Sequence, residues 1–201
     1  MHFNSTRRAG VRRLFLAALL AAGTTLPAIA AEVNGVQFND TVQLAGKELK
    51  LNGAGVRTRL MFKVYVAGLY LTEKAKTPAE VFRQDGPKRV AITMLRNVPA
   101  DTFANAFFEG MKDNVEMSER TRLQPQMRQF NEFFTAGEAL KKGDVVLLDW
   151  IPGSGTVCTL NGKKLGDPIP DQAFYNAVLR IWLGEDPVEK ILKAALLGTA
   201  R

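Results

Sequence analysis

The stretch from Gly53 to Leu71, GAGVRTRLMFKVYVAGLYL, constrains the fold of this chain more than any other segment. Val, Tyr, Phe and Leu crowd its second half, a composition typical of a half-buried strand. Side chains of a strand alternate between two faces, so one face of a single extended strand here is apolar throughout. The other face begins with Arg57 and Arg59 and becomes apolar after Tyr65. The pattern predicts one strand in the middle of a sheet, with its polar end near a cavity or the surface.

The first thirty residues are typical of a signal peptide. Four arginines form a positive n-region, an apolar run follows over Leu14–Leu20, and Ala28-Ile29-Ala30 supplies the small residues of a cleavage site. We therefore expect cleavage before Ala31, export to the periplasm, and a mature domain of residues 31–201. The apolar run is too short and too interrupted to span a membrane, and a retained N-terminal anchor is the alternative.

The composition excludes several classes of function. The formal net charge is +7, but the leader holds four arginines and no acid, so the mature part carries only about 7 − 4 = +3 and lacks the basic pattern of a nucleic-acid binder. The single histidine, His2, lies in the leader, which removes His-based triads and most metal sites. Cys158 has no partner for an intramolecular disulfide, and its apolar neighbours indicate a buried side chain. We expect no metal, no cofactor and no nucleic acid.

The rest of the chain predicts strands and helices without regular βαβ alternation. Strands are expected over 33–38, 41–44, 47–51, 53–71, 88–96, 144–150 and 155–160. Helices are expected over 77–82, 99–115, 119–134, 171–183 and 186–198. Asn161-Gly162 is the strongest hairpin signal in the chain. This order predicts an α+β fold in which a large antiparallel sheet carries helices on one face.

Few residues are candidates for chemistry. The chain contains no G-x-S-x-G, P-loop, Rossmann fingerprint or metal-ligand motif. Arg57, Lys63 and Tyr65 stand out, because cations within the most strand-like segment need a physical reason. They are either solvated strand-end charges beside a core tyrosine, or they belong to a binding site.

Several segments, in order, resemble the bacterial branch of the chalcone isomerase-like family. They are GAGVR followed by KVYVAGLYL, then DTFANAFFEGMKDN, GDVVLLDW, TLNGKKLG and AVLRIWLGEDPVEKILKAALLG. The resemblance covers nearly all of residues 32–198. It implies an open-faced β-sandwich, with a large antiparallel sheet, a helical layer and a ligand cleft between them.

The resemblance also implies that most polar groups of a plant chalcone isomerase site are missing. The arginine of that site falls on Arg57, and its central-strand threonine falls on Tyr65. Its helix tyrosine, lysine and asparagine and its last hydroxyl fall on Phe103, Ala106, Gly110 and Ile181. Little then remains to polarise a carbonyl, so we expect no chalcone cyclisation above the spontaneous rate. An isomerase or intramolecular lyase with another substrate is the alternative.

Fatty-acid-binding members of the family resemble this chain in having G-V-R and then K-V-Y. There the arginine and the tyrosine hold the carboxylate of a long-chain acid. The resemblance therefore implies a ligand site at Arg57 and Tyr65, with Phe103, Phe107 and Ile181 lining the pocket for the tail. An arginine gives a charge-assisted grip on a carboxylate, and a tyrosine hydroxyl adds a further donor.

The spacing of Arg57 and Tyr65 disagrees with this site. Eight positions separate them without Gly, Pro or Asn between, and a straight strand would hold them roughly 26 Å apart at about 3.3 Å per residue. Either the chain bends near 58–61, or Arg59 or Lys63 takes over as the anion ligand. Three functions therefore stay open: a periplasmic binding protein for a fatty acid or similar apolar carboxylate, an isomerase, and a ligand-free envelope scaffold.

Overall fold

The structure, a computed structural model, describes residues 1–2, 29–135 and 139–200. The predicted signal peptide, residues 1–30, lies almost wholly outside the described residues. Most strands form one seven-stranded antiparallel sheet in the order β11-β10-β9-β6-β5-β4-β3. These strands are β3 Thr41–Leu44, β4 Lys47–Arg59, β5 Phe62–Leu71, β6 Lys88–Met94, β9 Val145–Ile151, β10 Gly155–Leu160 and β11 Lys163–Lys164. Two small antiparallel pairs are β1 Ile29–Val33 with β2 Val36–Asn39, and β7 Val98–Pro99 with β8 Ala139–Leu140.

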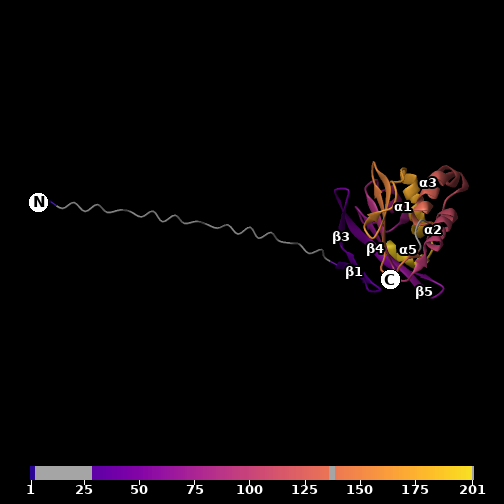
Figure 1. The fold of residues 1–201 in the computed structure, drawn as a ribbon, viewed down its shortest axis with the longest axis horizontal. Helices are drawn as coiled ribbons and strands as arrows, with labels where there is room; N and C mark the ends of the chain where they lie inside the picture. The colour runs from indigo at the N-terminus through magenta and orange to yellow at the C-terminus, as the bar shows by residue number, and fades with distance from the viewer. Residues whose placement is uncertain (3–28, 136–138, 201) are drawn as a thin grey trace.

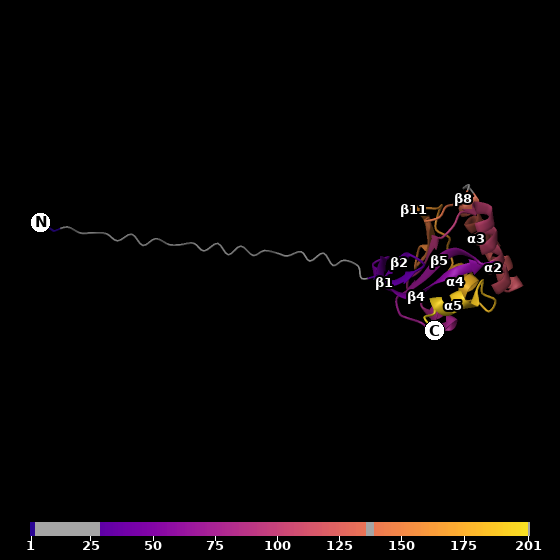
Figure 2. The same ribbon diagram turned by 90° about the horizontal axis from the view of Figure 1, so that it is seen from below.

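Helices lie on one face of the large sheet (Figures 1 and 2). They are α1 Pro78–Arg83, α2 Ala100–Asn114, α3 Met117–Thr135, α4 Gln172–Leu183 and α5 Lys190–Leu196. The β1–β2 pair lies on the opposite side of the sheet, where it helps to cover a smaller apolar cluster around Phe38, Leu49 and Val66. The α+β fold with a large antiparallel sheet and a helical layer is therefore confirmed.

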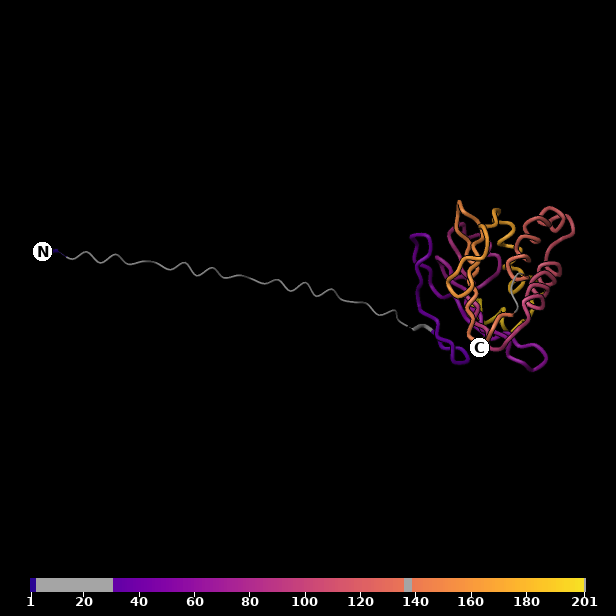
Figure 3. The backbone as a smooth tube through the Cα atoms, viewed as in Figure 1, coloured from indigo at the N-terminus to yellow at the C-terminus, as the bar shows by residue number. Residues whose placement is uncertain are grey.

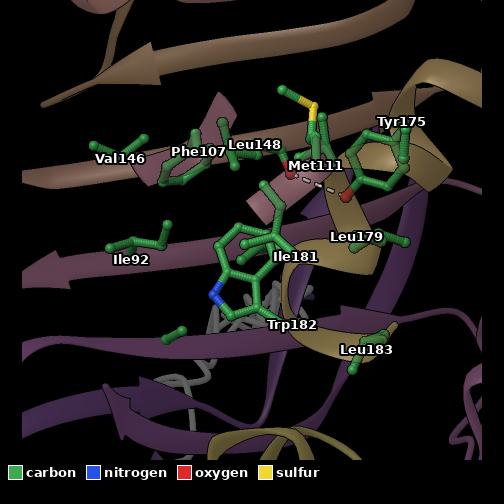
Figure 4. Packing of buried hydrophobic residues seen from close by; sticks show 14 of the residues in the cluster. Ile92, Phe107, Met111, Val146, Leu148, Tyr175, Leu179, Ile181, Trp182 and Leu183 are labelled. Atoms are coloured by element: carbon green, nitrogen blue, oxygen red, sulfur yellow. Dashed lines mark hydrogen bonds between the residues drawn. The ribbon is translucent and has the colours of Figure 1, made fainter. Parts of the chain in front are cut away.

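The main core lies between the sheet and helices α2, α3 and α4. Figure 4 shows Phe107 of α2 and Trp182 of α4 packed over Ile92 of β6. Tyr175 is fully buried, and its hydroxyl donates to the Leu148 carbonyl 3.1 Å away. The expected burial of Cys158 is confirmed as well. Apolar side chains of α2, α3 and α4 thus pack together with those of the sheet in one core.

The stretch Gly53–Leu71 is two strands rather than one, and this prediction was wrong. The chain turns at Leu60-Met61, where both residues have positive φ (47° and 66°), and β4 pairs with β5 in antiparallel register. Positive φ at both central positions is typical of a tight hairpin turn that usually contains Asn or Gly. Neither residue occurs here, so the sequence carried no turn signal at this point.

Two other boundaries also differ from the predictions. Residues 33–38 are not one strand, because Asn34-Gly35 forms the β1–β2 turn. The last helix begins at Lys190 rather than near Asp186, with Glu189 as its N-cap residue. The Glu189 side chain makes no capping bond and is free for contacts elsewhere in the fold.

Helix α5 packs unusually close to β4 because the strand carries glycines there. A Cβ atom at Gly53 would lie 2.1 Å from the Ala195 carbonyl oxygen, and one at Gly55 would lie 2.7 Å from the Ala195 Cβ. Buried Asn52 fixes the end of the helix, since its amide donates to the Leu196 carbonyl oxygen at 2.7 Å. This close approach brings Glu189 next to the far end of β4.

Candidate functional site

The β4–β5 hairpin brings the two predicted polar ligands together. Arg57 and Tyr65 are direct partners in the antiparallel ladder, and the register shifts between Arg57 and Thr58. Directly opposed residues in such a ladder have Cβ atoms about 4.5–5.5 Å apart, compared with roughly 26 Å along a straight strand. The turn and the local irregularity therefore remove the spacing conflict that the sequence raised.

Arg57 and Tyr65 lie at one side of a small cavity beneath α2. The cavity has a volume of about 90 Å³. All five predicted site residues line it: Arg57, Tyr65, Phe103, Phe107 and Ile181. Arg59, the alternative anion ligand, lines it as well. The sequence did not indicate a ligand-binding role for the other lining residues, which are Val64, Val98, Thr102, Ala106 and Val188. The wall is thus mainly apolar, with its polar groups on β4, β5 and the first turn of α2.

The hydroxyl group of Tyr65 is buried and oriented by a neighbour. The Trp182 indole nitrogen donates a hydrogen bond to this hydroxyl at 2.9 Å. Burial raises the pKa of Tyr65 to about 12, and the Trp182 hydrogen bond and the charge of Arg57 only partly oppose that rise. The hydroxyl is therefore neutral at ordinary pH. Within residues 29–135 and 139–200, no hydrogen-bond acceptor is found for its own hydrogen, so it is available as a donor.

The guanidinium of Arg57 faces a carboxylate from the end of the chain. Its Nη1 lies 3.5 Å from Oε2 of Glu189, and both side chains are 19% exposed. The same nitrogen also donates to the Thr58 carbonyl. Glu189 accepts a shorter bond of 2.7 Å from the Thr58 backbone N–H. Since charge-assisted bonds are usually about 2.7–2.9 Å long, the contact between Arg57 and Glu189 is a loose one.

The alternative anion ligands are placed differently. The Lys63 ammonium donates to the Asn34 side-chain oxygen at 2.5 Å and does not line the cavity. Arg59 does line it, although its side chain is largely exposed. Gly110 lies behind the wall, where a Cβ atom would stand 3.0 Å from Ile181. Arg57 is therefore the cation best placed beside Tyr65.

A shallow groove continues from the cavity toward the end of the hairpin. Its volume is about 310 Å³. Arg59, Val64, Val98 and Thr102 line both the groove and the cavity. The groove is completed by Leu60, Phe62, Arg96, Asn97 and Pro99. An apolar path with cations along it thus joins the Arg57–Tyr65 pair to the surface.

Comparison with known proteins identifies the family. The chalcone isomerase-like family matches residues 30–198, and the chain belongs to this family. The crystal structure of a fatty-acid binding protein from Arabidopsis thaliana has a similar fold, with a TM-score of 0.60 and 15% sequence identity. The match covers 81% of this chain and 92% of that one. Comparison with curated proteins gave no match.

The described residues contain no group of three or more His, Cys, Asp or Glu side chains arranged to hold a metal ion. None of the helices in the described part of the chain is both long and apolar enough to cross a membrane.

Proposed function

We propose that this protein binds a fatty acid or a similar apolar carboxylate in the cavity between the β4–β5 hairpin and α2. One observation carries the proposal: two hydrogen-bond donors, Arg57 and Tyr65, meet at the polar side of a mainly apolar cavity. A ligand that offers a carboxylate to both donors and carbon to Phe103 and Phe107 matches this arrangement. A fatty-acid binding protein with a similar fold supports the same class of ligand.

The volume of the cavity limits how such a ligand can lie. A cavity of about 90 Å³ corresponds to roughly three water molecules and is smaller than the about 300–1,000 Å³ of ordinary ligand sites. We therefore assign the carboxylate and the first carbons to the cavity. The remainder of the tail follows the groove past Val64 and Val98, or the wall formed by α2 moves outward to admit it.

Glu189 occupies the position of a competing carboxylate. Its contact with Arg57 is loose at 3.5 Å, whereas its bond from the Thr58 N–H is 2.7 Å long. A ligand carboxylate can replace the first contact while Glu189 keeps the second. Two carboxylates then share the neighbourhood of one guanidinium, so Glu189 opposes the binding of an anion. Glu189 thereby sets the affinity low enough for the ligand to leave.

We also propose that the protein acts after export, as residues 31–201. The n-region, the apolar run and the small residues before Ala31 support a cleaved signal peptide. N-terminal sequencing of the protein recovered from the periplasm tests this step. We expect Ala31 as the first residue, and an intact Met1 in a membrane fraction would contradict it.

Native mass spectrometry of the protein purified from its own cell envelope tests the binding function. We expect an added mass that disappears on solvent extraction, and an acyl acid in the extract. The Arg57→Ala variant, produced and purified in the same way, should carry much less of that mass. Arg83→Ala, an exposed arginine on α1, serves as the matched control. An empty wild-type cavity in protein recovered without detergent would favour the scaffold alternative.

A further inference from the structure

The tip of the β4–β5 hairpin, residues 59–63, exposes three consecutive large apolar side chains. Leu60, Met61 and Phe62 are 80%, 94% and 58% exposed. Elsewhere in the described residues, exposed large apolar side chains occur only singly. The tip also projects past the body of the fold, at the lower right of Figures 1 and 3. These side chains contribute nothing to the core, although exposure to water is unfavourable for them.

The turn within this tip lacks the residues that its backbone favours. The described chain has three other two-residue hairpin turns with positive φ at both positions: Asn34-Gly35, Ala45-Gly46 and Asn161-Gly162. Each has glycine second, where positive φ is free of strain. Leu60 and Met61 hold the same geometry at an energetic cost. Bulky apolar residues that are both strained and exposed point to a role outside the fold.

Cations surround the apolar tip. Arg59, Lys63 and Arg96 are exposed, and the Arg96 guanidinium lies 4.6 Å from the centre of the Phe62 ring. In the described part of the chain, none of the three forms an ion pair with an acidic side chain. The groove beside the tip is lined by Arg59 and Arg96 and by no acidic residue described here. The tip therefore combines an apolar end with a positively charged collar.

We infer that this tip docks on the surface of an anionic phospholipid bilayer. Leu60 and Met61 enter the boundary between headgroups and acyl chains, and the collar of Arg59, Lys63 and Arg96 contacts lipid phosphates. The apolar end is complementary to the acyl region of such a surface, and the surrounding cations are complementary to its phosphate groups. The groove opens beside the same tip. In the docked protein, the entrance to the cavity therefore faces the lipid. The docking itself requires no ligand in the cavity.

Vesicle flotation of the ligand-free protein tests this inference. We expect binding to phosphatidylcholine vesicles that contain phosphatidylglycerol, much weaker binding to phosphatidylcholine alone, and a fall in binding as salt is raised. Leu60→Asn/Met61→Gly should lower the partition coefficient at least about tenfold while improving the turn. Lys63→Gln/Arg96→Gln should lower it about 25-fold on the anionic vesicles, at about fivefold for each cation.

Two control variants match these changes in other parts of the molecule. Met117→Ser removes an exposed methionine beyond the opposite end of α2, and Lys47→Gln/Lys50→Gln removes two exposed cations at the opposite end of β4. Both should bind vesicles as the wild type does. The inference is overturned if the wild type does not bind anionic vesicles, or if Leu60→Asn/Met61→Gly binds them as well as the wild type does. It is also overturned if sedimentation shows that the tip changes dissociate an oligomer, because the tip would then bind a second copy. Ligand titration without vesicles reports separately on the cavity.

Discussion

Two hairpin turns of this protein have similar backbone geometry and very different sequences. The β10–β11 turn is Asn161-Gly162, with φ of 51° and 80°, and the β4–β5 turn is Leu60-Met61, with φ of 47° and 66°. The first joins strands that pair over only two positions, whereas the second joins a ladder running from Lys50↔Leu71 to Arg59↔Phe62. A long ladder with buried side chains can hold an unfavourable turn, and a short ladder depends on a favourable one. Turn chemistry therefore predicts a hairpin best where few other contacts hold its strands together.

Gly53→Ala should have the largest effect on stability, and it tests whether packing along β4 holds the hairpin in place. Gly53→Ala places a Cβ atom 2.1 Å from the Ala195 carbonyl oxygen, so α5 must move away from β4. We expect a loss of about 3 kcal/mol in the free energy of unfolding, measured by urea denaturation. The control is Gly35→Ala, where a Cβ meets open space and only the positive φ matters. It should lose about 1 kcal/mol, and an equal loss in both variants would contradict the packing argument.

The pH dependence of stability tests whether the Tyr65 hydroxyl, in the buried part of the hairpin, is neutral in the folded protein. Burial raises the pKa of Tyr65 to about 12 in the folded protein, compared with about 10 when unfolded. The neutral hydroxyl thus stabilises the fold fully below pH 10, and that contribution is lost as pH rises toward 12. Tyr65→Phe should remove roughly 2–3 kcal/mol of this alkaline destabilisation at pH 12. Chemical unfolding of both proteins at pH 8 and pH 12 measures the difference, and parallel losses would show that Tyr65 does not titrate as stated.

Exchanging the two turn sequences tests how much each hairpin depends on its turn. Leu60→Asn/Met61→Gly should stabilise the protein by about 1–2 kcal/mol, because it relieves positive φ at two bulky residues. Asn161→Leu/Gly162→Met should instead release β11, seen as faster amide hydrogen exchange at Leu165, whose N–H donates to the Cys158 carbonyl at 2.8 Å. If the first exchange destabilises the fold, the turn residues make contacts that their exposure does not reveal.

Replacement of Glu189 gives a smaller effect, on binding rather than on folding. Glu189→Gln keeps an acceptor for the Thr58 N–H and removes the charge beside Arg57. The affinity for laurate should rise by about 1 kcal/mol, since a like charge near the ligand carboxylate is lost. The affinity for lauryl alcohol, which carries no charge, should not change. Equal changes for both ligands would mean that Glu189 acts by shaping the cavity.

Sequence reasoning located the residues of the candidate site better than it located their elements. Residues matched to the family, such as Phe103 and Ile181, do line one cavity with Arg57, because they keep their order along a shared fold. The hairpin was missed because Leu60-Met61 carries no turn signal. From Tyr65 onward β5 is buried on both faces, and no Gly, Pro or Asn interrupts residues 57–65, so the whole stretch resembles a single buried strand.

The partners of the two polar ligands could not be predicted from local patterns. Trp182 lies 117 positions along the chain from Tyr65, and Glu189 lies 132 positions from Arg57. Contacts of this kind depend on how closely α5 approaches β4. The glycines of β4 allow this close approach, but their presence in the sequence does not predict it. The volume of the cavity likewise depends on side-chain packing across three elements. These features needed the three-dimensional structure.

Calorimetric titration of laurate into the wild type and Arg57→Ala measures whether Arg57 and Tyr65 together bind a carboxylate. Arg57→Ala should weaken binding by roughly 2–4 kcal/mol, as expected when one member of a desolvated charge pair is lost. Tyr65→Phe should weaken it by about 0.5–1.5 kcal/mol, and the exposed control Arg83→Ala should have no effect. If Arg59→Ala abolishes binding while Arg57→Ala does not, the assigned arginine is wrong; if neither changes the affinity, the carboxylate site does not exist.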